Sequence, residues 1–121
     1  MESRELIIKV YEVIGGADAI STSDGQAVFD RIHRAFQAGR KVVLDFQNIE
    51  LVISTFLNAA VGQLYGSYPE EFIREHIGVD HMAISDQNLL RIVTRRAKEY
   101  FKNRAEMEEI MAKSLGDGSE N

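Results

Sequence analysis

The sequence predicts an α/β fold: a small mixed, largely parallel β-sheet with helices packed against it, and a long C-terminal helix. Segments rich in β-branched residues alternate with segments whose apolar residues recur at helical spacing, which is typical of parallel strands joined by right-handed helical crossovers. The length of 121 residues, with 45% hydrophobic and 27% charged residues, is ordinary for one domain with one core. The last periodic segment is longer than a domain of this size needs to cover its sheet.

The first half of the chain is predicted to form strands on either side of one helix. Residues 6–13 are rich in β-branched side chains and end at a pair of glycines, which indicates a strand, and residues 19–22 form a shorter extended segment. Polar residues at 21–24 offer N-caps to an amphipathic helix that Gly39 ends. The apolar run at residues 41–46 is typical of a central strand that is covered on both faces.

Two short helices and a strand are predicted next. Ser54 or Thr55 caps the first helix, which is predicted to end at Gly66 and before Pro69, because proline disfavours helix at the residue before it. Pro69 then opens a second helix that ends at Gly78. Residues 81–85 carry apolar side chains in alternation and are expected to form the last strand.

The final helix is predicted to begin at Asp86, as its N-cap, and to run to about Lys113. At 1.5 Å per residue it would be roughly 40 Å long, so its end is expected to project from the domain. We therefore assign residues 1–104 to one α/β domain. Residues 105–121 are assigned to an extension of this helix and to a disordered polar tail from Gly116 onward.

The charge balance and residue usage argue against several classes of function. A net charge of −5 and a pI near 5.2 argue against a protein built to hold nucleic acid or an anionic membrane surface. The chain has no cysteine, which excludes disulfides, thiolate metal sites and cysteine nucleophiles and fits a reducing compartment. The first residues lack the order of a secretory signal, and the uncharged stretch at 51–69 is too polar for a membrane span, so we expect a cytoplasmic protein.

The most informative segment joins the predicted central strand to the next helix. It contains Val43-Leu44-Asp45-Phe46, then Ile49, then Ser54-Thr55-Phe56-Leu57. These residues resemble the STAS-like domains of the DUF4325 type, distant relatives of the STAS domains of bacterial anti-sigma-factor antagonists. In that family a strand ending in an aspartate leads into a Ser/Thr pair that opens a helix. The resemblance extends from about Thr22 to Phe101.

The resemblance implies a regulatory protein-binding module that needs no cofactor. Its partner would be an anti-sigma factor or a serine-kinase-like ATPase with the histidine-kinase-like fold. The partner would bind the unmodified module and leave when Ser54 or Thr55 is phosphorylated. A phosphate there would face the positive end of the helix and add about −2 charge to the surface. The implied partner-binding residues are Asp45, Ser54, Thr55, Phe56 and Asn58.

The same segment departs from the antagonists proper. In the antagonists the hydroxyl pair follows an acidic residue and precedes a glycine, whereas Ile53 and Phe56 stand at these positions here. Both departures fit the STAS-like branch better. That branch is also expected to carry an acidic pair just after the phenylalanine, where this chain has Asn58 and Ala59.

Each candidate residue also has a simpler explanation. Ser54 can serve only as an N-cap, with Thr55 as a first-turn residue, and a strand-terminal residue such as Asp45 is often a turn former. The histidines and acidic residues at 75–81 match no metal-binding signature, so no metal site is expected. Basic residues at 91–102 share one face of the last helix, which is expected to be solvated and paired within the helix.

No catalytic constellation is recognisable from spacing, so we do not expect an enzyme. The chain has no nucleophile elbow, no Ser/His/Asp set at a known spacing and no paired carboxylates at the ends of predicted strands. Two alternatives to the regulatory module remain. One is a structural module that self-associates through the projecting helix into a homo-oligomer, and the other is a domain that binds a nucleotide or small ligand near the start of the helix at Ser54.

Overall fold

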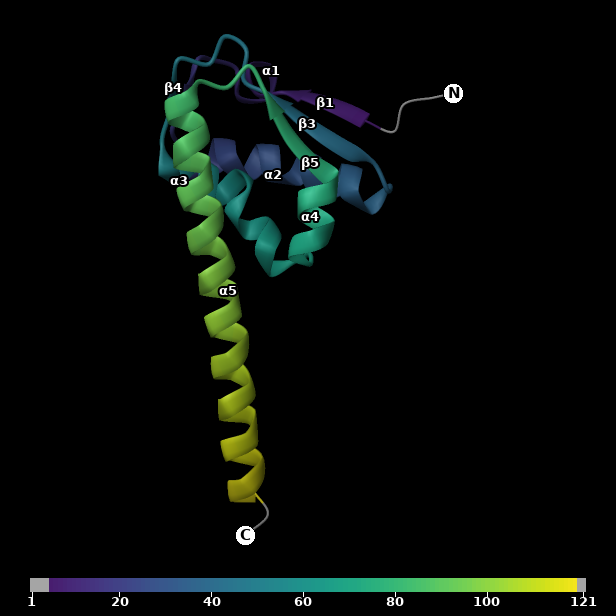
Figure 1. Cartoon of the computed structure of the whole chain (residues 1–121), viewed down its shortest axis with the longest axis vertical. Helices are drawn as coiled ribbons and strands as arrows, with labels where there is room; N and C mark the ends of the chain where they lie inside the picture. The colour runs from purple at the N-terminus through teal and green to yellow at the C-terminus, as the bar shows by residue number, and fades with distance from the viewer. Residues whose placement is uncertain (1–4, 120–121) are drawn as a thin grey trace.

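The computed structural model describes residues 5–119, with side chains as far as Ser114, and it contains two parallel sheets. The larger sheet has the order β1-β3-β5, and the smaller one pairs β2 with β4. The strands are β1 (Glu5–Lys9), β2 (Asp18–Ala19), β3 (Lys41–Asp45), β4 (Leu51–Val52) and β5 (Ile77–Asp80). The helices that pack on the larger sheet are α2 (Thr22–Gln37) and α4 (Glu70–His76), and α3 (Ser54–Ala60) packs on α2. Figure 1 shows them gathered on one side of this sheet, which confirms the α/β fold with parallel strands.

The helix-facing side of the larger sheet is buried, whereas its other side is partly exposed. The register aligns Ile8 with Leu44 and Val79, and both Ile8 and Leu44 are buried. The alternate row aligns Ile7 with Val43, and Ile7 is 59% exposed. The prediction that the central strand is covered on both faces is therefore wrong. Successive side chains of a strand point to opposite faces, and helices pack on only one of them here.

The N-terminal strand is shorter than predicted, because the chain turns helical after Lys9. Helix α1 (Val10–Ile14) follows β1 directly, with Val10 fully buried. Gly15 ends this helix in the left-handed conformation (φ 76°), where its N–H donates to the Tyr11 carbonyl. The β-branched run at 6–13 thus supplies a strand and a short helix, since glycine at a helix C-terminus favours this ending.

The last strand lies earlier than predicted. Strand β5 ends at Asp80, and the segment predicted as a strand, residues 81–85, contains a bend and the start of the final helix. His81 has a left-handed φ of 54°, which breaks the extended conformation. The alternating apolar residues of the last strand are Ile77 and Val79, which face the core beside β3.

Helix α3 is also shorter than predicted, and a 3-10 segment, η1 (Gly62–Gly66), follows it. α3 packs closely against α2 at Gly25, where a Cβ would lie 2.5 Å from the Phe56 carbonyl oxygen and 2.7 Å from Ala59 Cβ. Only a residue without a side chain fits this approach. Gly25 therefore determines how near α3 lies to α2.

Helix α5 (Ile84–Ser119) begins two residues before the predicted cap, Asp86, and extends past the domain, as predicted (Figure 1). Residues 116–119 are helical, so the disordered tail predicted from Gly116 is wrong at these positions, and residues 120–121 lie outside the described residues. Once a helix has formed, each added residue contributes a hydrogen bond without a new nucleus. Across residues 5–119, none of the helices combines the length and the apolar character needed to cross a membrane.

Candidate functional site

The residues predicted to bind a partner lie in three different settings. Asp45 is the last residue of β3 and is buried beneath the loop that follows it. Ser54, Thr55 and Asn58 are exposed on the first turns of α3. Phe56 is fully buried in the core, so its side chain does not reach the surface, contrary to the prediction that it contacts a partner. The ring of Phe56, the third residue of α3, faces inward because α3 lies between α2 and α5.

The two hydroxyls at the start of α3 do not cap it. The N-cap is Ile53, whose backbone is extended (φ −123°, ψ 164°), and among the described residues no side chain caps this helix. Ile53 continues the line of β4, where its N–H donates to the Ala19 carbonyl over 3.1 Å. The prediction of Ser54 or Thr55 as N-cap is therefore wrong, because the helix already begins at Ser54, one residue earlier than a serine cap at that position requires. Ser54 and Thr55 are exposed residues of the first turn.

A groove of about 630 Å³ runs between α3 and α5 beside these residues. Its lining residues come from α3, η1 and one face of α5: Ser54, Asn58, Gly62, Gln63, Leu89, Ile92, Val93, Arg96, Ala97, Tyr100 and Phe101. The α5 wall is mostly apolar. Arg96 is the one charged side chain among the described residues that line the groove.

Asp45 forms a second polar centre at the carboxyl edge of the larger sheet. Its Oδ1 accepts the Gln47 N–H over 2.9 Å and lies 2.9 Å from Nδ1 of His81. The two residues meet because the register aligns Asp45 with Asp80, which places His81 directly beyond the end of β5. The side chain of His81 is 52% exposed, whereas the Asp45 residue is only 8% exposed.

The electrostatics of this pair favour the charged form of both groups. The backbone N–H of Gln47, and then the hydrogen bond with His81, lower the pKa of Asp45 below its ordinary value of 3.8, against the opposing effect of burial. The hydrogen bond to Asp45, followed by the charge of Asp80, raises the pKa of His81 above 6.5. An ionised carboxylate only accepts hydrogen bonds, so Nδ1 of His81 carries the hydrogen that faces it.

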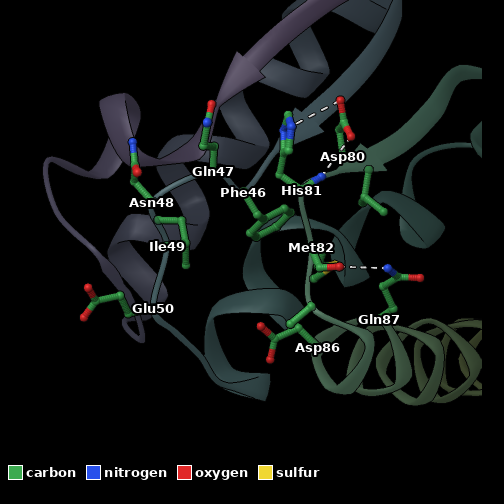
Figure 2. A pocket seen from close by; sticks show the side chains of 12 residues that line it. Phe46, Gln47, Asn48, Ile49, Glu50, Asp80, His81, Met82, Asp86 and Gln87 are labelled. Atoms are coloured by element: carbon green, nitrogen blue, oxygen red, sulfur yellow. Dashed lines mark hydrogen bonds and ion pairs between the residues drawn. The ribbon is translucent and has the colours of Figure 1, made fainter.

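A pocket of about 750 Å³ opens beside this pair (Figure 2). In Figure 2 His81 lies next to Asp80, Asn48 and Glu50 lie on the opposite side of the pocket, and Gln87 donates to the Met82 carbonyl. Asn48 (φ 70°) and His81 both have left-handed backbones and both line this pocket. Such conformations in residues other than glycine concentrate in turns and functional sites.

The described residues form no cluster of three His, Asp or Glu side chains that would hold a metal ion. His76 has a structural role: its Nδ1 lies 2.8 Å from the Phe72 carbonyl and its ring stacks on the Phe72 ring at 3.9 Å. The basic face of α5 is not paired only within the helix, because Lys98 bonds to Glu70 of α4 over 3.0 Å.

Sequence reasoning placed Asp45 correctly at a strand end but missed its contact with His81. The available signal was that side chains after neighbouring parallel strands meet at one edge of the sheet. That signal was lost because the last strand was predicted at residues 81–85, which put His81 at the start of a strand and not after its end.

A comparison with models of protein families matches residues 24–87, just over half of the chain, to the STAS-like domain of unknown function (DUF4325). The chain belongs to this STAS-like family. The matched segment runs from the first turn of α2 to the first turn of α5, so it contains both the α3 surface and the Asp45–His81 pair. No curated protein and no solved structure gives a significant match to the chain.

Proposed function

We propose that this STAS-like domain is a regulatory module that binds another protein through the start of α3 and the adjoining groove, and that it catalyses no reaction. The observation that carries the proposal is the pair of exposed hydroxyls, Ser54 and Thr55, which take no part in capping. They lie beside an open groove whose α5 wall is apolar. Exposed apolar surface edged by polar groups is typical of protein-binding sites.

The likeness of this segment to anti-sigma-factor antagonists supports a particular class of partner. That partner is an anti-sigma factor or a serine-kinase-like ATPase, which binds the unmodified domain. Phosphorylation of Ser54 or Thr55 would add about −2 charge to the binding surface. Ser54 and Arg96 line the same groove, so a phosphate on Ser54 would have a guanidinium partner within the domain itself. Pairing inside the groove would then close it to the protein partner.

The switch is tested first by intact mass spectrometry and peptide mapping of the protein isolated from its native cell under several growth conditions. A phosphate on Ser54 or Thr55 is the expected result. A chain that carries no phosphate under any of these conditions would contradict the switch while leaving binding itself open to the next experiment.

Binding is tested with tagged full-length variants used to capture the partner from native lysate. The alanine variants Ser54→Ala and Thr55→Ala should retain an ATPase of the kinase type, and at least one of Ser54→Glu and Thr55→Glu should lose it. Asn58→Arg, which adds a bulky charge to the groove wall, should also lose it, whereas Gln37→Arg at the exposed end of α2 should not. Equal capture by the alanine and glutamate variants would rule out the switch. Equal capture by Asn58→Arg and Gln37→Arg would rule out this surface.

A further inference from the structure

One face of α5 continues from the domain into the projecting part of the helix. Eight positions along this face are separated by alternating steps of four and three residues, the spacing of a coiled-coil seam. We call them the α5 seam: Leu89, Val93, Arg96, Tyr100, Asn103, Met107, Ile110 and Ser114. The first four line the groove beside α3, and Val93 is buried there. Further along, Met107 is 59% exposed and Ile110 is 61% exposed.

The projecting end of α5 has little to stabilise it within one copy of the chain. Every residue from 102 to 114 is exposed. Two ion pairs lie within this end, Arg104 with Glu108 at 3.2 Å and Glu109 with Lys113 at 3.6 Å. Pairs of this kind stabilise a helix by about 0.2 to 0.5 kcal/mol each. Most helical stability in proteins comes from packing of an apolar face, so a contact that covers the apolar side chains would stabilise this segment.

We propose that the α5 seam pairs with the seam of a second copy of this chain in an antiparallel dimer. The charge distribution along α5 argues for this occupant. Residues 91–104 contain six basic side chains and one acidic side chain, whereas residues 105–114 contain three acidic and one basic. An antiparallel pair places the basic stretch of each copy alongside the acidic stretch of the other. A parallel pair would place like charges side by side, which is unfavourable.

The position of the domain leads to the same orientation. α3 and η1 already pack on the seam side of α5 as far as Phe101, whose ring lies against Gly66. A parallel second helix on that side would bring its own domain to the place that the first domain occupies. In an antiparallel pair centred near residue 105, Tyr100 of one copy lies level with Ile110 of the other, and Met107 lies level with Asn103. The two domains are then at opposite ends of the helix pair.

This pairing does not depend on the proposed function, but it has a consequence for it. The last turns of the second α5 would run toward the groove that Ser54 and Asn58 line. Self-association and binding of the protein partner would therefore use adjoining surfaces and would weaken one another.

The dimer is tested by sedimentation velocity of the full-length chain over a wide range of protein concentrations. Ile110→Glu places a charge in the seam, and Ala105→Glu places the same charge on an exposed position away from it. We expect a reversible dimer for the unmodified chain and for Ala105→Glu, and a dissociation constant at least about tenfold higher for Ile110→Glu, which corresponds to about 1.4 kcal/mol. A chain that stays monomeric throughout, or equal association of the two variants, would overturn the proposal.

The orientation is tested by disulfide cross-linking, which this chain permits because it has no cysteine of its own. Full-length Tyr100→Cys and Ile110→Cys proteins are oxidised separately and as a mixture. The antiparallel pair predicts that the mixed disulfide between the two proteins dominates. Cross-linked homodimers of each variant, with no excess of the mixed species, would overturn the antiparallel arrangement.

Discussion

At the residue scale, the contact between Asp45 and His81 connects the ends of two neighbouring strands. Asp45 lies on the central strand, and its Oδ1 receives hydrogen bonds both from its own loop, at Gln47, and from His81. His81 is held from a second side, since its backbone N–H donates to Asp80 Oδ1. The charged groups that face its ring are therefore the carboxylates of Asp45 and Asp80. This contact is expected to make the stability of the domain depend on pH.

The direction of that dependence follows from the two pKa shifts. The pKa of His81 is raised in the folded domain. Its contribution to the stability of the domain is therefore fully present below pH 6.5 and is lost as the pH rises through the folded pKa. The pKa of Asp45 is lowered in the folded domain. Its contribution to the stability of the domain is therefore present above pH 3.8 and is lost as the pH falls through the folded pKa. The pair of Asp45 and His81 therefore stabilises the domain most between pH 3.8 and pH 6.5.

We predict that an NMR titration of His81 gives a pKa above 6.5, and that Asp45→Asn moves this pKa back toward 6.5. In denaturant unfolding, the free energy of unfolding should fall as the pH rises through the folded pKa of His81. His81→Gln should remove that part of the dependence. An unshifted His81 pKa in the unmodified protein would show that the contact with Asp45 is absent in solution.

At the scale of elements, the close contact of α2 with α3 depends on Gly25. In an exposed helix, replacing glycine by alanine stabilises by about 1 kcal/mol, because alanine has the higher helix propensity. At Gly25 the added methyl group would overlap the backbone carbonyl oxygen of Phe56 and the Cβ of Ala59 in α3. Backbone cannot move aside as a flexible side chain does, so the steric cost should exceed the gain in propensity.

We predict that Gly25→Ala lowers the free energy of unfolding by about 1 to 3 kcal/mol, the usual effect of overpacking a core contact. Gly16→Ala is the matched control, since a Cβ there meets no described atom within 4 Å and the backbone is not left-handed. The control should change stability by no more than about 0.5 kcal/mol. Chemical denaturation measures both variants. A Gly25→Ala protein as stable as the control would show that α2 and α3 are farther apart than the structure places them.

The elements that the sequence predicted well are those with a long periodic pattern or a clear stop. Helix α2 follows from its apolar spacing and from Ser21, whose hydroxyl accepts the Asp24 N–H as expected of a cap. The wrong predictions fall in segments whose composition suits both a strand and a helix. Residues 6–13 are rich in β-branched side chains in both halves, and only the burial of Val10 and the turn at Gly15 divide them into strand and helix. Local propensity does not contain that tertiary information.

At the scale of the whole molecule, the candidate site was predictable in part. The segment that joins β3 to α3 was recognised from its residues, and the family match covers it. The separation of this segment into two sites, the Asp45–His81 pair and the start of α3, was not predictable. That separation depends on which strand lies next to β3. Asp45 turns toward β5 and His81, whereas Ser54 and Asn58 turn toward α5. The sheet order β1-β3-β5 is what separates them.

The projecting end of α5 should be separable from the fold. The side chains beyond Phe101 are exposed as far as Ser114, and the two exposed ion pairs there contribute about 0.2 to 0.5 kcal/mol each, so about 1 kcal/mol at most together. We therefore predict that a chain ending at Arg104 keeps the fold, with a melting temperature at low concentration within about 8 °C of the full chain, since a difference of about 1 kcal/mol moves Tm by about 4 to 8 °C in a domain of this size. Circular dichroism measures the melting curve, and sedimentation velocity measures association.

The concentration dependence distinguishes what the removed segment does. If the end of α5 acts only between copies of the chain, the full-length protein becomes more stable as its concentration rises, because association stabilises the folded state by mass action. The stability of the shortened chain should then not depend on its concentration. The full-length Ile110→Glu protein should then behave like the shortened chain. A shortened chain that melts far below the full-length protein at every concentration would instead mean that the end of α5 stabilises its own domain. The boundary of the folding unit would then lie beyond residue 104.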